Sequence, residues 1–277
     1  MVLIINQYLA QMYMIPSGSM IDTLNIGDRV FVNKIIYGPE LLPGVLKLPS
    51  PVKPKRNDVI IFENPSYISR GPVFDIAQRL IYMLTLSFID IDRDENGEPR
   101  VHFLIKRAVG KAGDRFVMER GNMKILFAGE EAWVSETDYN ASRLWKHNVS
   151  RIMKDQEYES LAAAGKASAL IDLGLPVGDK LYNTALPAGN IEAPDYIAHE
   201  KARLEMLRKI TPADRRYAML LAKYNLGWYI SEGRVFPMGD NRDNSRDGRF
   251  FGPVRISKVL GRGTIIYWPL HRAGRIL

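Results

Sequence analysis

From Val101 to Asp114 the chain reads VHFLIKRAVGKAGD, and this stretch indicates how the protein is built. Its first part, Val101–Val109, is rich in β-branched, aromatic and aliphatic residues, which is typical of a strand. Because successive side chains of a strand point to opposite faces, Lys106 and Arg107 point in opposite directions. Only one of these two cations can therefore enter a site on a given face of the sheet.

Similar strand-like runs occur near both ends of the chain, each bounded by Gly, Pro, Asn or Asp. They are Arg29–Lys34, Asp58–Phe62, a hairpin of Arg115–Glu119 and Lys124–Phe127 around Gly121-Asn122, Arg234–Met238, Val254–Leu260 and Thr264–Trp268. The sequence therefore predicts a mainly β fold, with a β-rich core formed by residues 16–134 and 232–277.

The middle of the chain, residues 135–231, carries helical patterns and is predicted to be one large helix-containing insertion. Thr211 is the expected N-cap of one helix, with Pro212 at its first position and Gly227 as its stop. Residues 194–210 form a second helical pattern. The run AAAG at 162–165 is expected to be only a helix end or a turn.

The composition excludes several classes of protein. The chain has 277 residues, a formal net charge of +7 and no cysteine, so it has no disulfide scaffold, thiol nucleophile or cysteine-ligated metal. Its four histidines show no metal-ligand spacing, and the half-match to a calcium loop at 243–248 has Val254 at its twelfth position, where glutamate is required. We therefore predict no metal and no cofactor. The positive charge suits a phospholipid surface or a nucleic acid, and serves solubility equally well.

The first residues are apolar, since residues 1–15 read MVLIINQYLAQMYMI and carry no charge. As a helix they would reach about 22 Å, which is less than the hydrocarbon core of about 30 Å. We predict the end of a membrane anchor or an interfacial segment, the alternative being the first strand or helix of the core. A second apolar stretch, Val73–Ile91, carries Asp75, Gln78 and Arg79 within one turn. It is expected to be an interfacial helix or a buried core helix.

Three clusters carry the chemistry of this sequence. Pro16-Ser-Gly-Ser-Met20 follows the first apolar segment, although such a cluster by itself is usually a turn. If Ser19 is a nucleophile it needs a base, and no histidine lies in a catalytic motif. Lys106 is the remaining candidate, because burial lowers the pKa of a lysine whereas an arginine stays protonated. By itself Lys106 would be an ordinary solvated charge, and the third cluster, Gly239–Arg249, an ordinary hydrogen-bonded loop.

Together the clusters resemble, in order, the signature boxes of type I signal peptidases, the bacterial leader peptidase family of serine–lysine proteases. The boxes stand here as PSGSM at 16–20, KRAVGKAGD at 106–114 and GDNRDNSRDGR at 239–249, and Gly27-Asp28 and DVIIF at 58–62 resemble two further boxes. The resemblance covers roughly residues 11–65, 101–134 and 232–268 and leaves the middle of the chain untouched.

The resemblance implies a role for each matching residue. Ser19 would be the nucleophile, Lys106 the general base, Ser17 with the Ser19 N–H the oxyanion site, and Ser245 the hydroxyl that orients the lysine. Asp247 and Arg249 would form a supporting salt bridge. The residues that border the motifs would line shallow apolar substrate pockets: Tyr13, Ile15, Met20 and Ile105.

The same resemblance implies cleavage of signal peptides from exported preproteins at the bacterial cytoplasmic (inner) membrane, with the catalytic domain on the extracytoplasmic side. Its partners would be these preproteins and membrane phospholipid, and no nucleic acid is expected. It also implies a longer anchor than residues 1–15 provide, so we expect the front half of an anchor to be missing here. The sequence departs from the family pattern at Asp22 and Asn57, where proline and glycine are usual, which concerns local turn geometry.

Two rival functions remain open at this point. A self-cleaving SOS-repressor-like protein shares the dyad but needs a DNA-binding segment ahead of Ser19, and its possible cleavage pair, Ala164-Gly165, follows the nucleophile. A non-catalytic basic protein that binds membrane surfaces would use the +7 charge alone.

Overall fold

The computed structural model describes residues 10–42, 46–50, 52–85, 89–98, 100–143 and 149–276. The chain divides into two compact units. The first comprises Met1–Ala112, Ser231–Asp240 and Ser245–Leu277, and the second comprises Gly113–Ile230 and Asn241–Asn244. Each unit is described separately below.

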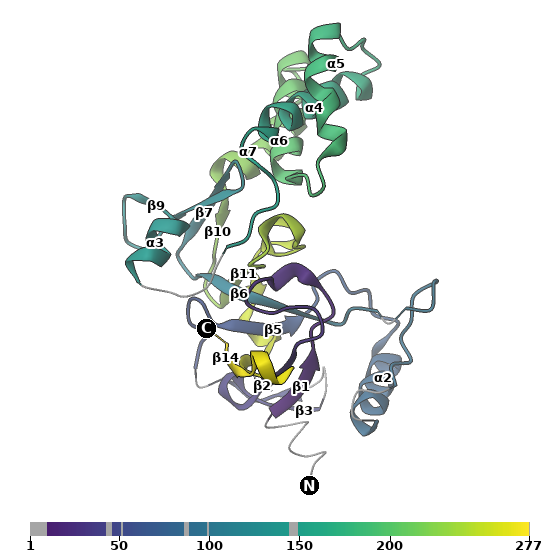
Figure 1. Cartoon of the computed structure of the whole chain (residues 1–277), viewed down its shortest axis with the longest axis vertical. Helices are drawn as coiled ribbons and strands as arrows, with labels where there is room; N and C mark the ends of the chain where they lie inside the picture. The colour runs from purple at the N-terminus through teal and green to yellow at the C-terminus, as the bar shows by residue number, and fades with distance from the viewer. Residues whose placement is uncertain are drawn as a thin grey trace. The chain divides into compact units, whose positions relative to one another are not determined.

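The first unit is built on one antiparallel sheet of eight strands, which confirms the predicted β-rich core (Figure 1). Its strands, in spatial order, are β1 (Ala10–Met14), β2 (Arg29–Asn33), β13 (Val259–Trp268), β5 (Val59–Glu63), β6 (Phe103–Lys111), β11 (Arg234–Met238) and β12 (Val254–Arg255), with β14 (Gly274–Arg275) paired to β13. A small separate hairpin joins β3 (Glu40–Leu42) to β4 (Leu46–Lys47). Short helical turns connect these strands: η2 (Gly18–Met20), η3 (Ile35–Tyr37), α8 (Gly248–Phe251), η6 (Ile256–Lys258) and η7 (Leu270–Arg272).

The central strand β5 is buried on both faces, because its alternating side chains enter two different hydrophobic clusters. Val59 and Ile61 belong to one cluster, and Ile60 and Phe62 belong to the other. β6 pairs with β5 along its length, with Lys106 opposite Ile60. Lys106 and Arg107 of β6 are therefore set into a well-packed sheet rather than at its margin.

The first apolar segment is partly a strand. Ala10–Met14 forms β1, which pairs antiparallel with β2, as the alternative reading of this segment expected. Ile15 follows it and is buried in the core. The rest of the predicted end of an anchor, residues 1–9, lies outside the described residues.

The second apolar stretch contains the helix α2 (Pro72–Leu84), which stands beside the sheet of the first unit (Figure 1). It is not a buried core helix, because Val73 and Leu84 expose 81% and 61% of their surface. Within the described ranges, every helix is either too short or too polar to cross a membrane.

The second unit contains a four-stranded antiparallel sheet in the order β10 (Trp228–Tyr229), β7 (Arg115–Glu119), β8 (Asn122–Leu126) and β9 (Trp133–Ser135). The predicted hairpin is present, but its turn is Arg120-Gly121 rather than Gly121-Asn122, because Asn122 already pairs with Glu119. This hairpin pairs with β9 and β10, so the second unit starts at Gly113 and not at the predicted boundary of 135.

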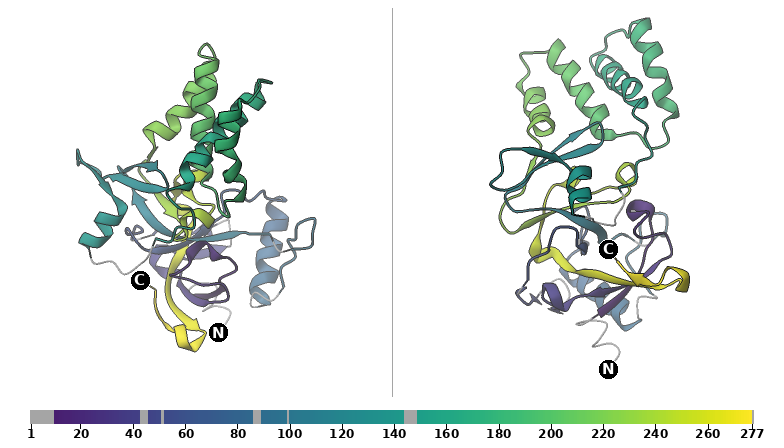
Figure 2. Two further views of the ribbon diagram at one scale, coloured as in Figure 1. Left: turned by 45° about the horizontal axis from the view of Figure 1, so that its top comes forward. Right: turned by 60° about the vertical axis from the view of Figure 1, so that its left-hand side comes forward.

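Helices make up most of the rest of the second unit, and α4, α5, α6 and α7 gather together in each view of Figures 1 and 2. They are α3 (Glu136–Ser142), α4 (Glu157–Asp172), α5 (Asp179–Ala185), η4 (Leu186–Asn190), α6 (Tyr196–Ile210) and α7 (Arg215–Leu226), and η5 (Arg242–Asn244) also belongs to this unit. The helical character predicted for the middle of the chain is therefore confirmed.

Two details of the helix prediction are wrong. The N-cap of α7 is Asp214, whose carboxylate accepts from Arg216 N–H. Thr211 is instead the C-cap of α6, where its N–H donates to the Leu207 carbonyl, and it begins the turn between the two helices. The run 162–165 lies inside α4 rather than at its end. The small residues are used for close packing, since a Cβ on Gly165 would lie 2.4 Å from the His199 carbonyl oxygen of α6.

Candidate active site

The candidate nucleophile Ser19 lies in the short turn η2 that follows β1. Pro16 ends the strand, and the turn is held from both sides because Ile15 and Met20 insert into the same hydrophobic cluster. Ser19 itself is buried, with 7% of its surface exposed. A serine held in this way has a fixed position, which a nucleophile requires.

Lys106 meets this serine from β6. Its Nζ lies 2.7 Å from Ser19 Oγ and also donates to the carbonyl of Ile105 at 2.9 Å. The lysine is 3% exposed, and burial lowers its pKa from 10.5 to about 8, against the opposing charges of Asp247 and Asp240. The structure thus brings together the two residues that the sequence singled out, and burial of Lys106 makes its neutral amine more accessible than that of an exposed lysine.

Ser245, Asp247 and Arg249 form a buried hydrogen-bonded group in the first unit. Ser245 Oγ donates to Asp247 Oδ2 at 2.8 Å, and the Gly239 N–H donates to the same oxygen at 2.9 Å. Arg249 pairs with Asp247 through Nε at 2.9 Å and Nη2 at 3.0 Å, so the expected ion pair is present. Burial would raise the pKa of Asp247, but the charge and hydrogen bonds of Arg249 hold it below its usual value.

This group lies against the nucleophile turn. A Cβ on Gly239 would lie 2.2 Å from Ser245 Oγ and 2.5 Å from the Ser19 carbonyl oxygen, so only glycine allows this approach. Because Ser245 donates its single proton to Asp247, its oxygen remains an acceptor. Such an acceptor suits an ammonium group.

Arg107 points away from Lys106 and forms a separate buried network that the sequence analysis did not assign. Its guanidinium donates to both carboxylate oxygens of Asp240, at 2.8 and 2.7 Å, and to the carbonyl of Asn57 at 2.9 Å. The Thr23 hydroxyl donates to Asp240 at 2.6 Å. The chain departs from the family pattern at Asp22 and Asn57. Thr23 directly follows the first of these positions, and Asn57 is the second. Asn57 has φ of 72°, in the left-handed region that glycine also favours.

The remaining predicted residues differ in how far they are exposed to solvent. Ser17 is exposed, precedes η2 and makes no capping hydrogen bond to it. Ile15 and Met20 are core residues, 2% and 0% exposed, and so offer no wall to a substrate in this conformation. Tyr13 and Ile105 are partly buried against the same cluster, and the ring of Tyr13 meets that of Phe103 edge-on.

Part of the third signature box is held by the second unit. Arg242 forms a bidentate ion pair with Glu136, and both side chains are buried. Asp243 accepts from Arg151 Nε at 2.9 Å and from two backbone N–H groups, those of Ile152 and Met153. No sequence pattern pointed to Glu136 or Arg151, because both lie far from the boxes.

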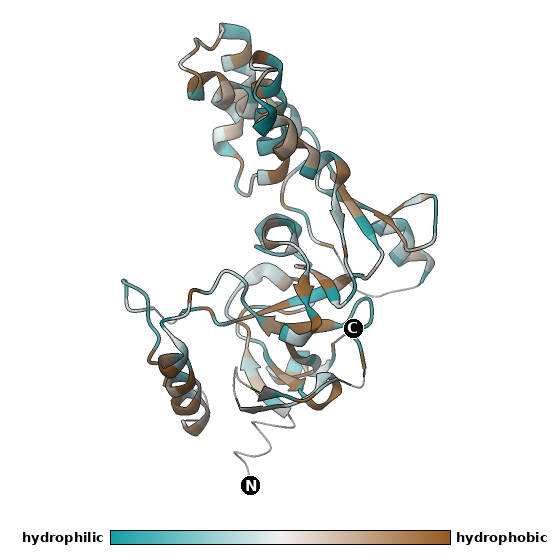
Figure 3. Cartoon of the chain, turned by 180° about the vertical axis from the view of Figure 1, so that it is seen from behind, coloured by the Kyte–Doolittle hydropathy of each residue, from teal (hydrophilic) through white to brown (hydrophobic). Residues whose placement is uncertain are grey.

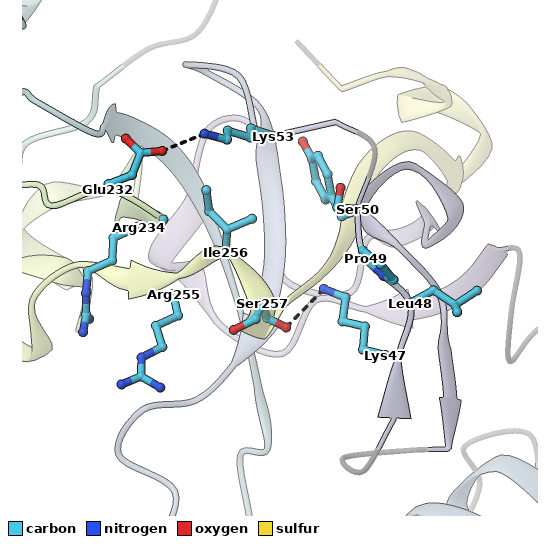
Figure 4. A pocket seen from close by; sticks show the side chains of 12 residues that line it. Lys47, Leu48, Pro49, Ser50, Lys53, Glu232, Arg234, Arg255, Ile256 and Ser257 are labelled. Atoms are coloured by element: carbon cyan, nitrogen blue, oxygen red, sulfur yellow. Dashed lines mark hydrogen bonds and ion pairs between the residues drawn. The ribbon is translucent and has the colours of Figure 1, made fainter.

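A cavity of about 610 Å³ occurs elsewhere in the first unit (Figure 4). Four cations line it, Lys47, Lys53, Arg234 and Arg255, and the Lys53 amine is paired with Glu232 at 2.7 Å. Its lining contains neither Ser19 nor Lys106. The cavity is therefore not the site of the serine and lysine.

Comparison with known proteins agrees with these boxes. The chain matches the family described as "Signal peptidase, peptidase S26" over residues 1–268. It is similar to Signal peptidase I of Haemophilus influenzae, with 27% identity over 98% of this chain and 67% of the relative. The corresponding enzyme of Aquifex aeolicus is 27% identical over 96% of this chain and 79% of the relative. That of Pseudomonas fluorescens is 28% identical over 94% and 61%. Since the family match spans nearly the whole chain, the protein belongs to the signal peptidase family, peptidase S26.

Proposed function

We propose that this protein is a membrane-associated endopeptidase that removes N-terminal signal peptides from exported preproteins by a Ser19–Lys106 mechanism. The observation that carries the proposal is the 2.7 Å separation of Lys106 Nζ and Ser19 Oγ in a buried setting. The substrate class follows from the printed name of the relatives, Signal peptidase I.

In this mechanism the neutral amine of Lys106 accepts the Ser19 hydroxyl proton while Ser19 Oγ attacks the carbonyl carbon of the scissile peptide. Collapse of the tetrahedral intermediate breaks the C–N bond, and the Lys106 ammonium returns the proton to the leaving amine. Water, activated by the same lysine, then hydrolyses the acyl ester and restores Ser19.

Three groups are proposed to assist this chemistry. The Ser19 N–H and the exposed Ser17 hydroxyl would stabilise the oxyanion. Ser245, fixed by Asp247 and Arg249, would orient the ammonium formed on Lys106. Tyr13 and Ile105 keep partly exposed surface and would form walls for small apolar side chains before the cut, whereas Ile15 and Met20 would support them from the core.

We further propose that the enzyme works at the bacterial cytoplasmic membrane, with the catalytic unit on the extracytoplasmic side, where the apolar signal segments of preproteins lie. The apolar character of residues 1–9 and the net charge of +7 support contact with anionic phospholipid.

Single substitutions of both dyad residues test the proposal. Ser19→Ala and Lys106→Ala should each lower preprotein cleavage by about 10⁴-fold or more, and the double variant should be no worse, because the two act as one unit. The assay is cleavage of a preprotein in detergent, with Lys258→Ala, an exposed lysine, as the control. Near-normal turnover by folded Lys106→Ala would exclude the dyad, and full activity of folded Ser19→Ala would exclude Ser19 as the nucleophile. Absence of cleavage by the folded wild type would favour a non-catalytic binding protein.

A further inference from the structure

The helix α2 exposes a stripe of apolar side chains on its surface. Val73, Ala77, Leu80 and Leu84 recur at helical spacing, and all four are exposed. Seen from behind, α2 carries brown, hydrophobic residues along its length (Figure 3). A surface helix of a globular protein normally has the reverse arrangement, with its apolar stripe facing the core.

Two polar residues of α2, Asp75 and Gln78, point inward instead. Gln78 is buried and donates to Asp90 at 2.8 Å. Asp75 accepts hydrogen bonds from Ser69 at 2.6 Å and from Tyr67 at 3.2 Å. These contacts fix the rotation of the helix about its axis, so the apolar stripe cannot turn inward without breaking them.

The segment after the helix repeats this inversion with the alternation of an extended chain. Ile89 and Ile91 are exposed, whereas Asp90 and Asp92 point inward. Asp92 is fully buried, accepts from Tyr67 at 2.8 Å and lies 3.1 Å from Arg70 and 3.7 Å from Arg100. Two independent periodicities therefore place apolar groups on the outside.

The acidic side chains of Asp75, Asp90 and Asp92 lie on the inner side of this segment, opposite its exposed apolar residues. We call the following exposed apolar residues of this segment the α2 face: Ile68, Val73, Ala77, Leu80, Leu84, Ile89 and Ile91. The carboxylates of Asp75, Asp90 and Asp92 each accept a hydrogen bond from a side chain of the same segment. At the start of the helix Arg70 is about half exposed and lies over the ring of Phe74, 5.4 Å from its centroid. The exposed acids of the segment come later, in the turn at 94–98.

An apolar face with a guanidinium at its rim is complementary to the interface of a bilayer that contains anionic lipid, where apolar groups are buried and cations meet headgroups. The helix has 13 residues and is about 20 Å long, so it would lie in the plane of the membrane and not cross it.

We propose that the α2 face docks into a phospholipid bilayer and forms a membrane contact distinct from residues 1–15. The inference rests on the proposed membrane-surface function and is independent of the Ser19–Lys106 chemistry.

The cysteine-free sequence allows a direct test with site-specific labels. Leu84→Cys would carry an environment-sensitive fluorophore, and Met219→Cys in α7, which is 75% exposed, would serve as the control. Vesicles of phosphatidylcholine with phosphatidylglycerol should shift the emission of the label at position 84 to the blue and leave that at 219 unchanged. An unchanged emission at 84 in the presence of bound vesicles would overturn the proposal.

A second measurement separates this inference from the proposed function. The double variant L80S/L84S should bind the same vesicles at least about tenfold more weakly than wild type, because two leucines no longer leave water. M219S/L226S in α7 should bind like wild type, and L80S/L84S should cleave a short peptide without lipid at the normal rate. If wild type binds and L80S/L84S binds equally, the α2 inference alone fails.

If wild type does not bind at all, the proposed membrane location fails with it, while peptide cleavage still tests the dyad. An emission shift at position 84 that grows with protein concentration in the absence of vesicles would identify a second copy as the occupant and would also overturn the proposal.

Discussion

The buried amine of Lys106 makes a quantitative prediction about pH. Its pKa is lowered from 10.5 to about 8, mainly by burial. If the neutral amine is the base, about one tenth of the enzyme is competent at pH 7 and about nine tenths at pH 9, so kcat/KM should rise roughly tenfold between them. Activity should then level off above pH 9 rather than fall.

The assay is the initial rate of cleavage of a fluorogenic signal-sequence peptide from pH 6 to 10 at constant ionic strength. Circular dichroism at each pH controls for unfolding, and Lys258→Ala, an exposed lysine paired with Glu63, should give the same profile as wild type. Asp247→Asn should move the acid limb to lower pH, because the carboxylate stabilises the Lys106 ammonium. A rate that is flat or falls from pH 6 to 9 would refute the reasoning, as would an acid limb centred near 10.5.

Two further predictions concern the stability of the second unit. Glu136→Ala should lower the free energy of unfolding by about 3–5 kcal/mol in urea titrations, because it leaves buried Arg242 without its carboxylate, whereas Glu232→Ala in an exposed pair should have no measurable effect. Gly165→Ala should destabilise the protein by about 1–3 kcal/mol, although alanine is the better helix former, because the new Cβ meets the His199 carbonyl oxygen. Gly189→Ala, where nothing lies within 4 Å, is its control, and equal melting temperatures for the two glycine variants would contradict the packing argument.

Local sequence patterns predicted many of the strands and helices of this protein, because these elements depend on the types and spacing of neighbouring residues. The strands follow from residue type and alternation, and the choice of Lys106 over Arg107 followed from alternation together with titratability. The prediction of the α7 N-cap was wrong because Thr211 and Asp214 are both good N-cap residues, and the local sequence does not decide between them. The prediction that residues 162–165 form a helix end or turn was wrong because the role of Gly165 depends on α6, a helix that follows later in the sequence.

Within the candidate site, too, some features follow from neighbouring residues and others depend on residues that are distant in sequence. The boxes indicate which residues are candidates for the chemistry, but the partners of a buried charge come from distant positions. Asp240 is 133 residues from Arg107 in sequence, and Arg242 is 106 residues from Glu136. Ile15 and Met20 border the nucleophile in sequence, yet the strand and turn geometry directs both into the core. Adjacency in sequence therefore does not determine whether a side chain points into the core or toward the surface.

The contrast between Lys106 and Arg107 explains how one strand can hold both the proposed base and a structural cation. Arg107 is fully buried, but a carboxylate, a hydroxyl and a carbonyl accept from its guanidinium, so its charge is retained. The hydrogen bonds of Lys106 go to neutral groups, the Ser19 hydroxyl and the Ile105 carbonyl, and its nearest carboxylates act only through their field. The lowered pKa corresponds to about 3 kcal/mol lost by the ammonium relative to the amine. A buried lysine whose direct partners are neutral holds its proton less tightly than an exposed one, and in this sheet its amine lies 2.7 Å from a serine hydroxyl.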